Sequence, residues 1–271
     1  MTASTLTFKI QDIIDLNLKS DIMVVCDGVG DIYQKKVSEI PPLGEKQVKI
    51  RYCPGTPPMV NLNELPGYYE IRLSCLDNTR NYRAIVFELA HEFGHVYLFP
   101  HELDRIYKSN EEKREYAQIS TWYNWFVESC CIAMAYICLD DIAQKWIGEP
   151  PYPNWSLYAP EFVRLREYKI CEALLALKIP SREKVTNWIQ SELPRLAKEC
   201  KTSDRPEQEA CAIAIERILK EYPDAWGALS YLGDAIENGR TDFDRWSELA
   251  TPEQRPLVKA LDQVFNYRMP G

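Results

Sequence analysis

Hydrophobic and polar residues alternate along two short stretches in the first part of the chain, residues 47–53 and residues 69–75. A third stretch, residues 21–26, is a short apolar run. Alternation with a period of two is typical of half-buried strands, and turns that contain proline and glycine lie between these stretches. The pattern therefore predicts a small antiparallel sheet within residues 1–76.

A helical spacing of apolar residues replaces this alternation further along the chain. It predicts a helix that begins between residues 78 and 81 and ends near Leu98, because Pro100 disfavours helical angles in the residue before it. A longer helix is predicted over residues 115–146. From residue 160 onward the pattern is helical to the end, with breaks at Pro180, residues 202–206, Pro223, Gly239 and Pro252.

The composition argues against several classes of protein. The 271 residues carry a net charge of −8 and are 46% hydrophobic, which allows a sizeable core and disfavours the basic surface that nucleic-acid binding needs. The most apolar long stretch, residues 126–139, is shorter than the roughly 20 residues that span a bilayer. Residues 1–18 contain no apolar run typical of a secretory signal. We therefore expect no nucleic-acid or membrane partner.

Nine cysteines are present, and no two of them are spaced as Cys-x-x-Cys. An odd number of cysteines, several of them in apolar runs, favours buried thiols in a reducing compartment. A disulfide framework or a cysteine-based zinc cluster is not expected. These features predict a cytoplasmic protein.

The first predicted helix carries the clearest chemical signal, a His-Glu-x-x-His motif at residues 91–95. His91 and His95 are four residues apart and so share one helix face, where both imidazoles can bind one metal ion. Glu92 lies beside them, where its carboxylate can accept a proton from a metal-activated water. The chain has only three histidines, so this spacing is not expected by chance. The motif predicts a zinc-dependent hydrolase, in the first place a peptidase.

Two further residues of this helix call for an explanation. Gly94 lowers helix stability, so we expect another backbone to approach closely at that position. Glu88 lies one turn before the motif. We expect it to be an ordinary helix acid, with orientation of a metal ligand as the alternative.

A catalytic zinc ion takes three protein ligands and keeps one position open, and two residues compete for the third place. His101 has the spacing of the third histidine of metzincins, but Leu98 stands where those proteins have a glycine that turns the chain. Glu128 is the lone carboxylate in the apolar run of the second helix, and a buried carboxylate requires a paired charge or a metal. We favour Glu128, with an ion pair to an arginine or a helix terminus as its structural alternative.

The motif helix also resembles that of a known family. Residues 88–95, Glu-Leu-Ala-His-Glu-Phe-Gly-His, are similar to the helix motif of the ImmA/IrrE metallopeptidases. The second helix of that family carries the third ligand in a pattern that this chain matches at Glu128, Cys131, Met134-Ala135 and Cys138-Leu139. Asp140-Asp141 stands where the family often has Met-Pro. The resemblance covers roughly residues 69–145.

The resemblance implies a gluzincin-type site in which His91, His95 and Glu128 bind Zn²⁺ and Glu92 acts as general base. Zinc would activate a water molecule, and Glu92 would take its proton and pass it to the leaving amine. A second donor to the oxyanion is expected. Four residues stay open as candidates for that donor: His101, Tyr97, Tyr116 and Tyr123.

The pattern and the motif together predict an α+β fold with two regions. We expect a zincin-like catalytic core over residues 1–147, built from a small antiparallel sheet, the motif helix and the ligand helix. A mainly α-helical region is expected over residues 160–271. It is expected to pack on the core, with binding of a regulatory protein as its alternative role. Residues 148–160 are expected to be an ordered linker rather than a loop over the cleft.

The predicted function is hydrolysis of peptide bonds in an intracellular protein or peptide substrate. Two alternatives stay open. The first is a non-catalytic protein that keeps a zincin fold as a sensor or interaction module, and the second is a zinc hydrolase of a non-peptide amide. The substrate, the mode of activation and the oligomeric state are not written in the sequence.

Overall fold

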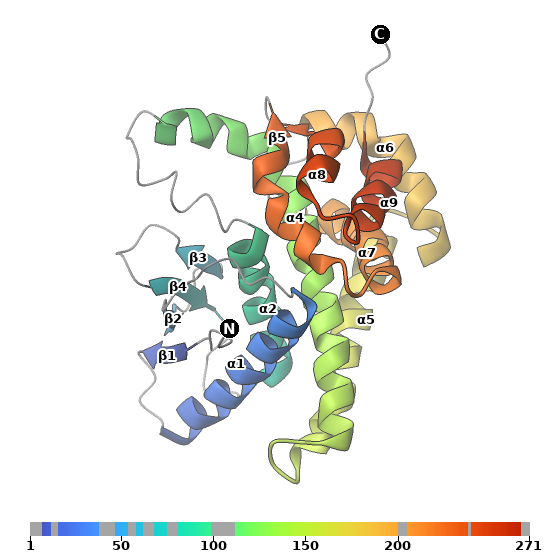
Figure 1. Cartoon of the computed structure of the whole chain (residues 1–271). Coiled ribbons are helices and arrows are strands. Elements are labelled where there is room, and N and C mark those ends of the chain that lie inside the picture. Colours follow the sequence, from blue (N-terminus) through green and yellow to red (C-terminus); the bar gives the residue numbers. More distant parts are fainter. Residues whose placement is uncertain are drawn as a thin grey trace.

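A small sheet and a set of long helices make up the computed structural model, which describes residues 7–11, 16–37, 47–53, 58–61, 68–74, 81–98, 112–199, 205–237 and 240–266. The sheet and the first two helices lie on one side of the molecule (Figure 1). The C-terminal helices lie on the other side, and the long helix α4 passes between the two parts.

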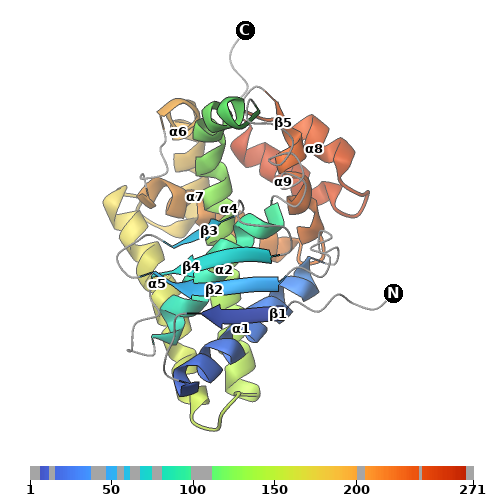
Figure 2. The ribbon, with the colours of Figure 1, turned by 90° about the vertical axis from the view of Figure 1, so that its left-hand side faces the viewer.

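The N-terminal sheet has the strand order β1-β2-β4-β3 (Figure 2). β1 (Thr7–Gln11), β2 (Gln47–Tyr52) and β4 (Tyr68–Leu73) run parallel to one another. The short β3 (Met59–Asn61) pairs antiparallel with β4. The two alternating stretches are strands as predicted, but the prediction of an antiparallel sheet is wrong.

The apolar run at residues 21–26 explains this difference, because it belongs to a helix and not to a strand. Helix α1 (Leu16–Lys36) connects β1 to β2, and parallel neighbours need such a crossover of a dozen or more residues. Its buried residues follow helical spacing: Ile22, Val25, Cys26, Val29, Ile32 and Tyr33. A short apolar run fits a buried strand and a buried helix equally well, so the run by itself could not separate the two.

Helix α2 (Tyr82–Leu98) carries the His-Glu-x-x-His motif and ends at the predicted residue. Glu88 fixes this helix to the sheet. Its carboxylate accepts hydrogen bonds from the backbone N–H and the hydroxyl of Ser74, at 2.8 and 2.7 Å, just after the end of β4. Glu88 therefore joins the motif helix to the neighbouring strand.

Helix α4 (Glu112–Gly148) is the second predicted helix. It lies between α2 on one side and α5 (Ala159–Ala176) and α7 (Arg205–Glu221) on the other (Figure 1). Neighbours on both sides explain its apolar middle, because a helix that is buried all round is hydrophobic all round. Residues 125–127 and 129–139 are all buried, and the cysteines among them are free thiols as predicted.

The remaining elements complete the C-terminal part. They are α6 (Val185–Glu199), α8 (Phe243–Leu249), α9 (Arg255–Phe265), 3-10 turns at Trp155–Tyr158, Arg182–Lys184, Trp226–Tyr231 and Gly233–Ala235, and a ladder of β5 (Ile236–Glu237) with β6 (Arg240–Thr241). Asp242 caps α8, since its side chain accepts a hydrogen bond from the backbone N–H of Arg245. Within the described parts of the chain, no helix has both the length and the apolar character needed to cross a bilayer.

The segment rich in proline and aromatic residues between α4 and α5 lies away from the motif. Trp155 packs against Tyr82 and Trp146, with ring centroids 4.6 and 4.7 Å apart. Tyr82 begins α2, about 13 Å along the helix axis from His91. The segment is therefore an ordered connection between two helices, as predicted.

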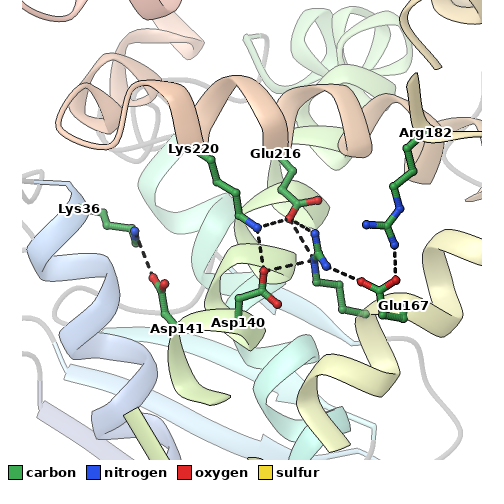
Figure 3. Close-up of polar contacts among 8 residues, drawn as sticks. Lys36, Asp140, Asp141, Glu167, Arg182, Glu216 and Lys220 are labelled. Carbon is green, nitrogen blue, oxygen red and sulfur yellow. Dashed lines mark hydrogen bonds and ion pairs between the residues drawn. The ribbon is translucent and has the colours of Figure 1, made fainter. Parts of the chain in front are cut away.

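A network of charges joins α4, α5 and α7 (Figure 3). Arg166 of α5 donates to Glu216 of α7, with Nε 3.0 Å from Oε1, and lies 3.5 Å from Asp140 of α4. Lys220 lies 2.7 Å from Asp140 and 2.8 Å from Glu216. The network thus connects the ligand helix to two C-terminal helices.

The neighbouring Asp141 has a separate partner. It pairs with Lys36 of α1 at 3.1 Å, so the two adjacent acids hold α4 to helices on different sides (Figure 3). Asp140-Asp141 departs from the Met-Pro that often closes the family pattern. These contacts give that departure a local structural explanation.

Candidate metal centre

Two imidazoles of α2 and one carboxylate of α4 converge in the structure. Nε2 of His91 lies 3.2 Å from Nε2 of His95. The Glu128 carboxylate faces both rings, with Oε2 3.1 Å from Nε2 of His91 and Oε1 3.3 Å from Nε2 of His95. The three residues predicted as metal ligands are therefore brought together.

The spacing of these donor atoms fits a small metal ion. Bonds of about 2.0–2.1 Å at tetrahedral angles place the ligand atoms about 3.3 Å from one another. The two imidazole nitrogens are 3.2 Å apart, and each has a different oxygen of the Glu128 carboxylate near it, at 3.1 and 3.3 Å, so all three separations are close to that value. The group could therefore hold a metal ion through two nitrogen atoms and one oxygen atom.

The surroundings of two of the three donors, His91 and Glu128, favour the protonation states that a cation needs. Burial lowers the pKa of His91 to about 4, against the opposing effect of Glu128, so its imidazole is neutral at pH 7. Burial also opposes the charge of Glu128, but hydrogen bonds with His91 and His95 hold the pKa of this carboxyl well below its usual range. A neutral His91 and an ionised Glu128 can bind a metal without first losing a proton. His95 differs, because burial opposes its charge but Cys131 and Glu128 raise the pKa of its imidazole well above the usual value, so a metal has to displace its proton.

Gly94 sets the distance between the two helices that carry these donors. A Cβ atom at this position would lie 3.1 Å from both Cα and Cβ of Cys131 and 2.9 Å from its Sγ. The predicted close approach of another backbone is thus confirmed, and that backbone belongs to α4. Gly94 lies between the two histidines, and Cys131 lies one turn after Glu128. The close contact of the two helices at this point therefore also sets the spacing of the three candidate ligands.

We expect Gly94→Ala to destabilise the protein by about 1–2 kcal/mol, because overpacking at the crossing outweighs the helix propensity of alanine. Urea unfolding measures this change, and metal affinity should fall with it as α2 and α4 separate. Gly28→Ala in α1 is the matched control. Its Cβ would meet Cδ1 of Ile142 at 3.5 Å, an ordinary contact, so this substitution should stabilise. Equal effects of the two substitutions would contradict the role given to Gly94.

Glu92, the predicted general base, is buried on the same helix, with 3% of its surface exposed. At 100° per residue, its side chain leaves the helix on the face next to that of His91. Its participation in proton transfer stays a prediction.

Among the candidates for the second oxyanion donor, the structure describes the side chain of Tyr97. Its ring stacks on Tyr33 of α1, with centroids 5.0 Å apart. At 100° per residue it leaves α2 about 160° from His95, on the other side of the helix from that candidate ligand. The other candidates lie outside the described residues or have side chains that do: His101, Tyr116 and Tyr123.

Sequence reasoning missed three charged residues beside the site. Arg205, the first residue of α7, has Nη1 3.8 Å from Oε2 of Glu128. Its Nε lies 3.5 Å from Oε1 of the buried Glu209, which also pairs with Lys169 of α5 at 3.5 Å. The one available signal was Glu209, a carboxylate within an amphipathic helical pattern, which is the same kind of signal that singled out Glu128.

Comparison of the chain with models of known protein families, with curated protein sequences and with solved structures finds no match. The resemblance to the ImmA/IrrE metallopeptidases therefore rests on the two helix patterns and stays a prediction. The convergence of His91, His95 and Glu128 does not depend on that resemblance.

Proposed function

We propose that the protein is a zinc-dependent peptidase with a zincin-like pairing of motif helix and ligand helix, acting on a protein or peptide substrate. The observation that supports this most directly is the convergence of His91, His95 and Glu128, with donor atoms 3.1–3.3 Å apart. Two imidazoles and one carboxylate are the protein ligands of catalytic zinc in well-known peptidases. Structural zinc sites use four protein ligands instead.

The donor set also bears on which metal is proposed. Magnesium and calcium take oxygen ligands, and calcium takes six to eight of them. Imidazole nitrogen suits zinc and the other late first-row metals. The Glu92 position, beside the first histidine of the motif, adds the general base that zinc peptidases of this kind use.

In the proposed reaction, His91, His95 and Glu128 would hold a zinc ion, which would supply a water molecule of lowered pKa and a positive charge to polarise the substrate carbonyl. Glu92 takes a proton from the attacking water while the new C–O bond forms at the carbonyl carbon. The same carboxyl then gives this proton to the amine nitrogen as the C–N bond breaks. One water is consumed, and one carboxylic acid and one amine are released.

Metal binding tests the ligand set. We expect the wild-type protein to bind one zinc ion per chain. Glu128→Ala removes one of the three protein ligands and should lower the zinc affinity at least about 100-fold. Metal analysis after dialysis and competition with a chelator measure both quantities. Glu149→Ala removes an exposed carboxylate just after α4 and should leave the affinity unchanged. Zinc retention in Glu128→Ala together with its loss in His101→Ala would make His101 the third ligand.

Hydrolysis is tested by comparing the protein termini of cells that produce the wild type with those of cells that produce Glu128→Ala. Termini that appear only with the wild type would support a peptidase and would identify its substrates. If the protein binds zinc but the two sets of termini are the same, a sensor or a hydrolase of a non-peptide amide becomes the better description.

A further inference from the structure

Arg205 brings a positive charge to the candidate metal centre from the far part of the chain. Its Nη1 lies 3.8 Å from Oε2 of Glu128, which is longer than a hydrogen bond. The Arg205 side chain is 40% exposed and that of Glu128 is 20% exposed, so the arginine lies where solvent reaches the ligands. Arg205 therefore forms an ion pair with Glu128, the structural alternative expected for this carboxylate, but no hydrogen bond with it.

The guanidinium group also pairs with a carboxylate on its own helix, and that carboxylate has a partner on α5. Nε of Arg205 lies 3.5 Å from Oε1 of Glu209, one turn further along α7. The side chain of Glu209 is 7% exposed. Glu209 also pairs with Lys169 of α5 at 3.5 Å. The Lys169 ammonium lies 4.4 Å from the ring centre of Phe87, one turn before His91 on α2. Arg205 thus belongs to a set of contacts that extends to the motif helix.

A positive charge at this place works against metal binding, because like charges a few ångströms apart disfavour each other. A neutral side chain in place of Arg205 would not compete with the metal for the negative charge of Glu128. Arginine is also the side chain best suited to bind an anion, through its permanent charge and its planar set of N–H donors. The position therefore fits a residue that acts on an anion formed at the metal.

We propose that Arg205 is the second donor to the oxyanion that develops on the substrate carbonyl. The inference rests on the proposed peptidase function. As water adds to the carbonyl carbon, the π electron pair moves onto the carbonyl oxygen, and the guanidinium donates to that oxygen. When the C–N bond breaks, the electron pair returns to re-form the carbonyl. A preorganised donor of this kind acts where negative charge develops, so it favours the transition state over the bound substrate.

Inorganic phosphate is a suitable probe, because it is a tetrahedral anion and requires no knowledge of the substrate. The full-length protein is loaded with cobalt(II), whose visible absorption reports anion binding, and is titrated with phosphate. We expect Arg205→Gln to weaken phosphate binding about 10- to 100-fold, the effect of losing one charged hydrogen bond. Arg205→Lys should weaken it less, because the charge is kept. Arg164→Gln removes a 71% exposed arginine of α5 and should change nothing.

Zinc affinity and kinetics separate this role from a structural one. Zinc affinity should be unchanged or higher in Arg205→Gln, since a repelling charge is removed. With a substrate identified, kcat should fall in this variant while KM changes little, because the oxyanion is absent from the bound ground state.

Three results would overturn the inference while leaving the proposed function in place. They are equal phosphate affinity in the wild type and Arg205→Gln, no phosphate binding by the metal-loaded wild type, and loss of zinc from Arg205→Gln. The last of these would mean that Arg205 positions Glu128 and does not bind the anion. Failure of the proposed function looks different, since the wild type would then bind no zinc, or would bind zinc and produce no new protein termini, and the role of Arg205 would fall with it.

Discussion

Replacing Glu92 by glutamine should lower the rate of peptide hydrolysis by about 10²- to 10⁴-fold and leave zinc bound. Glutamine has the size of glutamate but cannot accept the proton of the attacking water. It also fills the same space, which matters because Glu92 is only 3% exposed. The donor atoms belong to His91, His95 and Glu128, so the metal keeps these ligands.

The rate is measured on a substrate identified from cellular termini, and zinc content is measured on the same sample. Glu88→Gln is the control on the same helix, because that carboxylate accepts hydrogen bonds from Ser74 and lies outside the donor group. It should lower stability slightly and leave kcat near the wild-type value. Undiminished hydrolysis by Glu92→Gln would assign the base to another residue.

Replacing Glu216 by glutamine should destabilise the fold by about 1.5–3 kcal/mol, the effect of losing a buried hydrogen bond between charged groups. The Glu216 carboxylate is 5% exposed and pairs with both Arg166 and Lys220 (Figure 3). Arg166 is itself 11% exposed, so water replaces the lost partner poorly, but Asp140 and Glu167 stay beside the guanidinium and keep the loss below that of an unpaired buried charge. Urea unfolding should show a lower midpoint at an unchanged slope.

Asp141→Asn is the matched control for this network. Its ion pair with Lys36 has side chains that are 36% and 23% exposed, and pairs that water reaches contribute about 0–1 kcal/mol. The double substitution Arg166→Met, Glu216→Leu should recover most of the loss, because apolar replacement of a buried pair is often neutral. If Glu216→Gln proved as stable as Asp141→Asn, the network would not contribute as a buried pair does.

The helices and the convergence of His91, His95 and Glu128 could be predicted because each depends on a local pattern along the chain. His91 and His95 share a face whenever residues 82–98 are helical, whatever surrounds them. Glu128 was predicted from a second local feature, since a lone carboxylate in an apolar helix needs a partner. These two signals come from separate helices, and they meet at the crossing of Gly94 with Cys131.

The sheet direction and Arg205 could not be predicted in this way, because both depend on contacts between distant segments. The direction of β2 relative to β1 depends on whether residues 21–26 form a strand or part of a crossover helix. A run of that length carries too little of either period to decide. The contact of Arg205 with Glu128 depends on how α7 packs against α4, and no local pattern around Arg205 marks it.

The backbone contact between Gly94 and Cys131 bears on how the protein could respond to changes in zinc supply. Many small zinc domains are unfolded without their metal, so losing the ion means losing the domain. Here the candidate donors lie on two helices whose spacing is set by close packing, so we expect the site to keep its shape without an ion. The metal-free protein would then stay folded, and a rise in available zinc would convert it to the metal-loaded form without a folding step.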